Sequence, residues 1–447
     1  MHLPASPRSR ARFALFSLLV AALAPLGCAP TPAARAAEQG QFDGLRASLA
    51  AEVQQGQLGP RQAASFAKAL ARGEVRRAKG EEGAQRIRDF ATCAREVEGA
   101  LDDRADTHDA LGAVAALVLL DAGVSSPGSY SRWVKADANG PEAAWRAPGA
   151  RSLSGGSDGP LRRKMIADAD EEVRRSALHA ALAAADPEDT EAVLEAARVD
   201  PSPAARAQAI RAAGAIGGER AVLALVDLWP HADEAARESI VAAWAMHPSF
   251  NSGGRRELIK VVDRGHGRAA IAASLTLMRA GGDGADGARG ALERAVREGP
   301  AAARVRAIEV APLSLSPMRE AVVKASTESD EAVAAAATAR LFESPPELGG
   351  PVDAAARATL SERLLKLAES GAGSATARGA LARAHDPRLL PLLTRDGEAK
   401  EQKTRAEAGA ALAVYGDLPR AAVVAADPEP RVRVAVACAI LRAWAAR

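Results

Sequence analysis

The chain has little of what marks most disulfide-rich or nucleic-acid-binding proteins. Of its 447 residues only 3% are aromatic and three are cysteines, and its net charge is +2. Three cysteines are too few for a disulfide framework, and a near-neutral chain lacks the basic face that nucleic-acid binders need. The chain is also too long for one compact core, so it forms either several domains or an open array.

Motifs of catalysis and metal binding give no signal either. None of the seven histidines stands in a His-Glu-x-x-His pattern or pairs with a cysteine at metal-ligand spacing. The glycine runs at 214–218 and 281–284 stand where helices are expected to end, which suits glycine better than phosphate binding does. The sequence therefore predicts no catalytic residue, no metal ligand and no cofactor, and the protein is predicted not to be an enzyme.

Alanine is the residue that the chain has in abundance, with 111 copies. It has the highest intrinsic helix propensity, and its small side chain lets helices pack with their backbones close together. No stretch rich in β-branched residues competes with these helices. The expected fold class is therefore all-α.

A recurring phrase shows how the helices are organised. The phrase that begins at Asp168 returns at Asp200 and at Asp427, with weaker copies between them at a period of about 31 residues in the first half. With the aspartate as position zero, position five is Val or Ala, position six is usually Arg, and positions nine and ten are apolar. Such repetition predicts stacked helix pairs. The arginines at position six are Arg174, Arg206, Arg237, Arg268, Arg304, Arg378, Arg405 and Arg433.

These residues resemble the HEAT repeat, in the short bacterial form that is also seen in the phycobilisome-lyase type. The signature of that family is Asp, then Val-Arg, then apolar residues along the second helix of a pair, ending in Gly. The clearest copy here spans 200–218, and the resemblance covers roughly 161–447. It implies a right-handed α-solenoid, a HEAT-like superhelix of stacked antiparallel helix pairs.

Each recurring residue also has a structural explanation. The aspartate at the turn is expected to accept the free N–H groups of the next helix, a cap that contributes about 1 kcal/mol. Positions five, nine and ten share one helix face and are expected to pack into the stack. The arginine is expected to meet the aspartate of a neighbouring repeat, so that the array carries a structural ladder of arginine–carboxylate pairs rather than a binding strip.

Composition divides the chain into five parts. We expect a signal peptide at 1–27, a tether at 28–40, a capping or degenerate helical region at 41–123, an aromatic and Gly/Pro-rich linker at 124–160, and the repeat array at 161–447. The leader has arginines followed by an apolar run that is too short to span a membrane, which is typical of an export signal.

The end of the leader resembles the lipobox of bacterial lipoproteins, on the match of Leu26, Gly27 and Cys28. The resemblance implies that Cys28 carries the lipid and that the protein faces the periplasm, with the outer membrane favoured over the inner. Pro25 departs from the usual pattern, so an ordinary cleaved signal, with a soluble periplasmic or secreted product, is the alternative.

Two further cysteines, Cys93 and Cys438, lie near opposite ends of the chain. Distant repeats of an open solenoid do not touch, so both are expected to be buried free thiols. A Cys93–Cys438 bridge is the alternative.

Tryptophans supply the candidate partner-binding residues, because tryptophan is enriched at interaction hot spots. Trp133 and Trp145 fall in the expected linker, where they form either a recognition patch or plugs that seal the junction. Trp229 lies in the array, and Trp244 stands at a helical spacing typical of core.

The sequence therefore predicts a non-enzymatic scaffold of the bacterial cell envelope that binds another protein or peptide and is held at the membrane by an N-terminal lipid. One alternative is a lyase-type repeat protein that handles a chromophore or cofactor. The other is a structural spacer of the envelope without a particular ligand.

Overall fold

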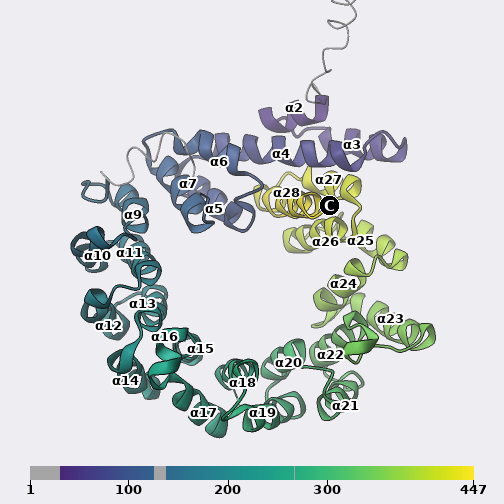
Figure 1. Ribbon diagram of the computed structural model, residues 1–447. Coiled ribbons are helices and arrows are strands. Elements are labelled where there is room, and N and C mark those ends of the chain that lie inside the picture. The colour runs from purple at the N-terminus through teal and green to yellow at the C-terminus, as the bar shows by residue number, and fades with distance from the viewer. Residues whose placement is uncertain (1–30, 125–136, 266) are drawn as a thin grey trace, which may run out of the picture.

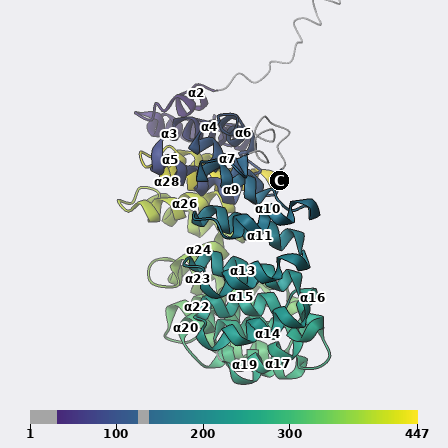
Figure 2. The same ribbon diagram turned by 90° about the vertical axis from the view of Figure 1, so that its left-hand side faces the viewer.

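Helices make up all the regular secondary structure of the described residues, 31–124, 137–265 and 267–447, in the computed structural model (Figure 1). Successive helices lie side by side and follow one another around a closed ring. In the view from the side (Figure 2), α13–α20 lie at the opposite end of the ring from α2–α6. The predicted helical-repeat solenoid is confirmed, but it is closed on itself rather than open.

The chain begins with a group of helices that carry no clear copy of the repeat phrase. The longest, α4, has Pro60 at its first position, where the missing N–H of proline costs nothing. Phe66 and Leu70 of α4 are fully buried. The elements of this group are α2 (Pro32–Gln39), α3 (Leu45–Gln54), α4 (Pro60–Arg77), α5 (Gly80–Asp89), η1 (Phe90–Cys93), α6 (Glu98–Ala105) and α7 (Ala110–Asp121).

The rest of the chain is the repeat array, in which helices alternate between two layers. In Figure 1 the helices α11, α13, α15, α18 and α20 face the centre of the ring, while α10, α12, α14, α17 and α19 lie outside them. The first half of the array contains α9 (Ala143–Arg151), η2 (Gly156–Asp158), α10 (Gly159–Ile166), α11 (Glu171–Ala184), η3 (Pro187–Asp189), α12 (Thr190–Val199), α13 (Pro203–Ile216), α14 (Gly218–Leu228), η4 (Trp229–His231), α15 (Glu234–Trp244), α16 (His247–Ser249), η5 (Phe250–Gly254) and α17 (Arg255–Arg264).

The second half continues in the same way and brings the chain back to its start. Its elements are α18 (Arg268–Ala280), α19 (Ala285–Arg297), α20 (Ala301–Val310), α21 (Ser316–Ala325), α22 (Glu331–Glu343), η6 (Pro346–Leu348), α23 (Ala354–Ala368), α24 (Ser374–Arg383), η7 (Pro387–Leu389), α25 (Leu390–Asp396), α26 (Gln402–Tyr415), α27 (Leu418–Ala425) and α28 (Pro430–Ala445). Among the described residues, no helix combines the length and the apolar character needed to cross a membrane.

Positions five, nine and ten of the repeat pack into the stack as predicted. Val173, Ala177 and Leu178 of α11 are fully buried, and so are Ala205 and Ala209 of α13. Because these positions recur in each unit, every inner helix presents the same small apolar face to its neighbours. Burial of that face supplies the main stabilisation of the array.

The aspartate at position zero does not cap the next helix directly, contrary to the sequence prediction. Asp200 accepts the N–H of Ser202 at 2.9 Å, and it is the hydroxyl of Ser202 that caps α13 by accepting the N–H of Ala205. Asp168 likewise accepts the N–H of Asp170, which caps α11. The conserved element is thus an Asx turn that ends one helix and places a separate cap for the next.

Two of the expected non-repeat segments contain helices. Part of the expected tether at 28–40 forms α2, which packs on α4 and buries Ala33, Ala34 and Ala37. The expected linker at 124–160 contains α9, which lies between α7 and α11 and continues the array. Both helices are short and contain a proline, at the first position of α2 and inside α9, and both pack on neighbouring helices.

Ring closure is the main departure from the predicted architecture. Helix α28 packs on α4, α5 and η1, and α27 packs on α3 and α4. One hydrophobic core therefore contains residues from both ends of the chain, among them Phe66, Phe90, Val432 and Ile440. Figure 1 shows the purple N-terminal helices lying against the yellow C-terminal ones.

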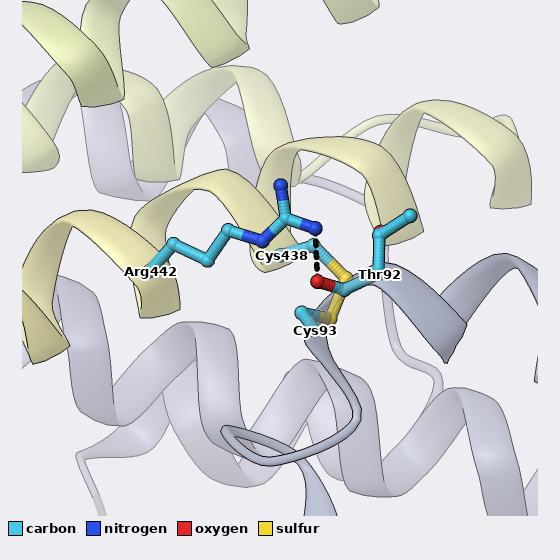
Figure 3. Close-up of a disulfide and its surroundings, with 4 residues drawn as sticks. All are labelled: Thr92, Cys93, Cys438 and Arg442. Atoms are coloured by element: carbon cyan, nitrogen blue, oxygen red, sulfur yellow. Dashed lines mark hydrogen bonds between the residues drawn. A yellow bond between two sulfur atoms is a disulfide. The ribbon is translucent and has the colours of Figure 1, made fainter. Parts of the chain in front are cut away.

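A disulfide joins the two ends of the ring, so the prediction of two free thiols was wrong. Cys93 at the end of η1 is bonded to Cys438 of α28, with 5.4 Å between the two Cα atoms (Figure 3). Beside it, the guanidinium of Arg442 donates a hydrogen bond to the carbonyl of Thr92. The prediction failed because it assumed an open stack, in which residues so far apart along the chain cannot meet.

Candidate interaction site

A ladder of arginine–carboxylate pairs runs along the array, as the sequence predicted. Arg174 donates from Nε and Nη2 to the two carboxylate oxygens of Asp200, at 2.7 and 3.0 Å. Bidentate pairs of this kind are stronger and more directional than single hydrogen bonds. The other pairs along the array are Arg146–Asp168, Arg304–Glu328, Arg378–Asp396 and Arg405–Asp427.

The same arginines also bind the turn that precedes their own helix. Nη1 of Arg174 donates to the carbonyls of Asp168 and Ala169, at 3.0 and 2.9 Å. Arg405 makes the equivalent bonds to the carbonyls of Ala399 and Lys400. Each arginine of an intact pair therefore joins its own turn to the carboxylate of the next unit.

Hydrogen bonds lower the pKa of two carboxylates of the ladder, Asp168 and Asp200. The pKa of Asp168 lies below its usual value chiefly because of the hydrogen bond from Arg146. For Asp200, burial alone would raise the pKa, but hydrogen bonds from Arg174 and from the N–H of Ser202 outweigh it and lower the pKa. These pairs are thus saturated internal contacts, with no free group for a ligand.

The last arginine of the ladder closes the ring. Arg433 donates to Glu74 of α4 at 2.7 Å, where a further repeat would have supplied an aspartate. Glu74 is fully buried and also pairs with Arg77 at 2.9 Å and Arg86 at 3.3 Å. Arg46 adds a contact to Asp427 at 3.6 Å. Helix α4 therefore acts as the next repeat for α28.

The ladder is interrupted in the middle of the first half of the array. Arg206 donates to the carbonyls of Asp200 and Pro201 but has no carboxylate partner among the described residues. Arg237 makes no hydrogen bond or ion pair within the described part of the chain, and Arg268 pairs backwards with Glu238. The cause can be read in the sequence, because the place of the aspartate in the units of Arg237 and Arg268 is taken by His231 and Val262.

A cavity of about 360 Å³, which we call the Trp229 cavity, opens at this interruption. Its aromatic wall consists of Trp229 and Trp244, whose rings stack with centroids 5.5 Å apart. The guanidinium carbon of Arg237 lies 5.6 Å from the centroid of the Trp229 ring, a cation–π contact. The remaining lining residues are Val226, Pro230, Glu257, Lys260, Val261, Arg264 and Gly265.

Local packing places Trp244 deep in this cavity. Helices α13 and α15 approach closely because Gly214 has no side chain; a Cβ atom there would lie 2.5 Å from the Cα of Ala243. After Trp244 the short α16 and the π-helical η5 interrupt the regular pairing before α17. The unit that carries the cavity is therefore the least regular of the first half of the array.

The charges of the Trp229 cavity are not balanced. Lys260 is paired with Glu257, at 2.8 and 2.9 Å to the two carboxylate oxygens. Arg237 and Arg264 have no acidic partner among the residues that the structure describes. In addition, Nε of Arg237 and the indole Nε1 of Trp244 are buried donors that find no acceptor in the described part of the chain, which is unusual in a folded protein.

A second depression, which we call the Arg211 groove, lies on the other side of η4. It has a volume of about 690 Å³ and is lined by residues of α12, α13 and α15, including Arg198, Arg206 and Arg211. Its two carboxylates are already engaged, since Asp233 caps α15 and Glu238 pairs with Arg268. Both depressions are thus rich in unpaired arginine.

The predicted site residues have different outcomes. Trp229 lines the Trp229 cavity and is partly exposed. Trp145 is 2% exposed and stacks on His108, with ring centroids 4.3 Å apart, as a residue that seals a junction does. Trp133 and Cys28 lie outside the described residues. Trp244 is 2% exposed, which confirms its prediction as core.

Sequence reasoning missed two features. Arg237 was taken as one more member of the ladder, although the loss of aspartate six residues before it and before Arg268 was a readable signal. A Gly-x-Ser-x-Gly pattern at 155–159 was also overlooked. It forms η2 and the start of α10, no strand precedes it among the described residues, and Ser157 bonds no histidine there, so it lacks the geometry of a hydrolase nucleophile.

The family comparison agrees with the repeat architecture. The family model of HEAT repeats matches residues 160–245, which include Trp229, Arg237 and Trp244. A crystal structure of an engineered protein from the Northeast Structural Genomics Consortium is similar over 79% of this chain and 96% of its own, at 18% identity and a TM-score of 0.28. No curated protein was found to match the chain.

Proposed function

We propose that this protein is a non-enzymatic interaction scaffold, exported and lipid-anchored in the bacterial cell envelope, that binds another protein. The observation that carries the proposal is the disulfide between Cys93 and Cys438, which fastens the two ends of a HEAT-repeat ring. Structural disulfides persist in oxidising compartments and are rare in a reducing cytosol. This supports export by the leader at 1–27.

The anchor in this proposal is Cys28. Each CH₂ group of an acyl chain buried in the bilayer contributes about 0.8 kcal/mol, so that several chains on one cysteine hold a protein stably. Helix α2 begins at Pro32 and packs on α4 beside the ring junction. A lipid on Cys28 would thus hold the ring close to the membrane, with only a few residues between them.

The interaction role rests on the repeat array. Helical repeat arrays present extended curved surfaces, and attachment to a membrane raises their local concentration near other envelope proteins. The intact pairs of the ladder, such as Arg174–Asp200, engage their charged groups with one another. The unpaired arginines and tryptophans at its interruption supply the kind of side chains that bind proteins.

Metabolic labelling with an alkyne analogue of palmitate tests the anchor. We expect the wild-type protein to be labelled and to sediment with membranes, and the Cys28→Ser variant to carry no label. The Cys93→Ala/Cys438→Ala variant is the matched control, because it changes cysteines without removing the lipid site, and it should label like the wild type. Labelling of the Cys28→Ser variant would contradict the proposal.

Export and partner binding are tested separately. Maleimide modification of denatured, unreduced protein from cells should find Cys93 and Cys438 blocked, and free thiols there would contradict export to an oxidising compartment. Photo-crosslinking in intact cells from a position beside Trp229 should capture a specific protein, whereas the same crosslinker on the exposed outer helix α21 should not.

A further inference from the structure

We propose that the Trp229 cavity and the Arg211 groove together bind an acidic segment of the partner protein, one of whose side-chain carboxylates takes the place of the missing ladder partner of Arg237. The inference rests on the proposed interaction function and adds the chemical class of the partner. It is carried by the comparison of Arg237 with the other arginines of the ladder.

Arg237 occupies the sixth position of its unit, as Arg174 and Arg405 do in theirs. Each of those two arginines spans two carboxylate oxygens at 2.6–3.0 Å. The guanidinium of Arg237 instead lies over the Trp229 ring, and no described residue accepts a hydrogen bond from it. Among the described residues it is therefore the one arginine of the ladder that makes no hydrogen bond or ion pair, and it lines the Trp229 cavity.

The surroundings of Arg237 favour a ligand in which a negatively charged group is attached to an apolar stem. Arg264 adds a second unpaired positive charge, while the only carboxylate that lines the cavity, Glu257, is neutralised by Lys260. The stacked rings of Trp229 and Trp244 offer an apolar surface directly beside these charges. A carboxylate on a short aliphatic stem fits both, because its methylene groups lie on the rings while its oxygens meet Arg237.

The arrangement of the two depressions favours a protein segment over a small anion. Leu228 at the end of α14 and His231 of η4 line the Arg211 groove. Trp229 and Pro230, which lie between these two residues in the chain, line the Trp229 cavity. A chain that crosses η4 would therefore reach both. In the groove it would meet Arg206 and Arg211, neither of which pairs with a carboxylate of the described chain, so that more than one acidic residue would be bound.

Fluorescence anisotropy with a defined probe tests the inference on the purified mature protein. The probe is a labelled, C-terminally amidated peptide of about 12 residues with Asp at every second position, which spans roughly 40 Å when extended. A peptide with Asn in place of each Asp is its matched control. We expect the Asp peptide to bind and the Asn peptide to bind at least about tenfold more weakly, because the amide does not carry the charge that pairs with arginine.

Three variants locate the binding. Arg237→Ala should weaken binding of the Asp peptide at least about tenfold, and Arg237→Lys should weaken it by about threefold, because lysine keeps the charge but loses the bidentate fork. Arg319→Ala removes the same charge from an exposed position on α21 and should change affinity by less than about twofold. Circular dichroism of each variant confirms that the ring is folded.

Several results would overturn the inference. These are equal binding of the Asp and Asn peptides, an unchanged affinity of Arg237→Ala, an equal loss in Arg319→Ala, or no binding of the Asp peptide at millimolar concentration. Competition by free glutarate at the affinity of the peptide would show a site for small dicarboxylates instead. Because these measurements use purified protein, they can fail while export, lipidation and partner capture in cells succeed, and the reverse.

Discussion

The same kind of arginine–carboxylate contact occurs in two regions of the ring. The two partners are close in sequence in one region and far apart in the other. In the array, Arg174 and its partner Asp200 are 26 residues apart, and the contact follows from the repeat. At the junction, Arg433 and Glu74 are 359 residues apart, and the contact requires the whole ring to close. The comparison shows that a contact which joins neighbouring repeats can also join the two ends of the chain.

The two contacts, Arg174–Asp200 and Arg433–Glu74, also differ in how far their charges are buried. The side chain of Arg174 retains 11% of its exposure and that of Asp200 retains 3%, whereas Glu74 is fully buried and holds three arginines. Leaving a buried charge without its partner lowers the free energy of unfolding far more than breaking a surface pair does. The junction should therefore be the more sensitive of the two.

Removal of Glu74 is the change with the largest expected effect. The Glu74→Ala variant leaves Arg433 buried without a carboxylate, so we expect the free energy of unfolding to fall by about 3–5 kcal/mol. Small-angle X-ray scattering should show a larger radius of gyration if the ring opens. Urea unfolding followed by tryptophan fluorescence measures the stability.

The matched control for Glu74→Ala is Glu191→Ala, which breaks an exposed pair with Arg220 in the array. We expect a change of less than about 0.5 kcal/mol there. A loss of stability of similar size in both variants would contradict the distinction between the junction and the array.

Loss of the disulfide is expected to rank second. The Cys93→Ala/Cys438→Ala variant should be less stable by about 2–4 kcal/mol, because the bond removes conformational freedom from the unfolded chain. Both cysteines are replaced together so that no unpaired thiol remains. Wild-type protein that is denatured, reduced and refolded under reducing conditions should show the same loss, and the double variant should not respond to reductant. Equal stability of the oxidised and reduced wild type would contradict this prediction.

Two identical substitutions compare an intact pair of the ladder with the interruption. Arg174→Lys loses the bidentate contact to Asp200 and should cost about 1.5–3 kcal/mol. Arg237→Lys has no such contact to lose and should change the free energy of unfolding by less than about 0.5 kcal/mol. A larger loss at Arg237 than at Arg174 would show that Arg237 has a structural partner after all.

An acid titration probes the array alone and has the smallest expected effect. Hydrogen bonds from Arg388 lower the pKa of Asp386 to about 2, with a further contribution from the hydroxyl of Ser361. A lowered pKa means that the contribution of Asp386 to stability is complete above the unfolded value of about 3.9 and is lost as the pH falls through about 2.

The Asp386→Asn variant checks this sign. Between about pH 4 and about pH 2 the melting temperature of the wild type should fall more steeply than that of the variant, by a difference worth less than about 1 kcal/mol because the pair is partly solvated. Parallel curves for the two proteins would contradict the assignment.

The array was predictable from the sequence because its contacts are local and repeated. Val173, Ala177 and Leu178 lie on one helix face in any stacked helix pair, and the pairing of Arg174 with Asp200 follows from the same period. The Asx turn was not predicted correctly, because Asp200 and Ser202 are both good caps and only their backbone geometry decides which one acts.

Closure of the ring could not be predicted in this way. Whether α28 meets α4 depends on small rotations between successive units that add up around the chain, and no single residue encodes their sum. The sequence left a Cys93–Cys438 bridge only as the alternative, since two cysteines on apolar helix faces also suit a core as free thiols. Trp229 was named as a candidate from the sequence, but Arg237 was missed, because it fits the repeat and only the residues six positions before it and before Arg268 differ.

A closed ring has no end from which to fray. In an open solenoid the terminal helices pack on one side only, so unfolding and proteolysis begin there. Here α3 and α4 pack on α27 and α28, so a helix pair of the array has a neighbour on each side and must separate from both when it opens. Such a molecule should resist aminopeptidases, carboxypeptidases and partial melting as long as the junction is intact. Once the junction opens, unfolding should proceed from it in both directions along the chain.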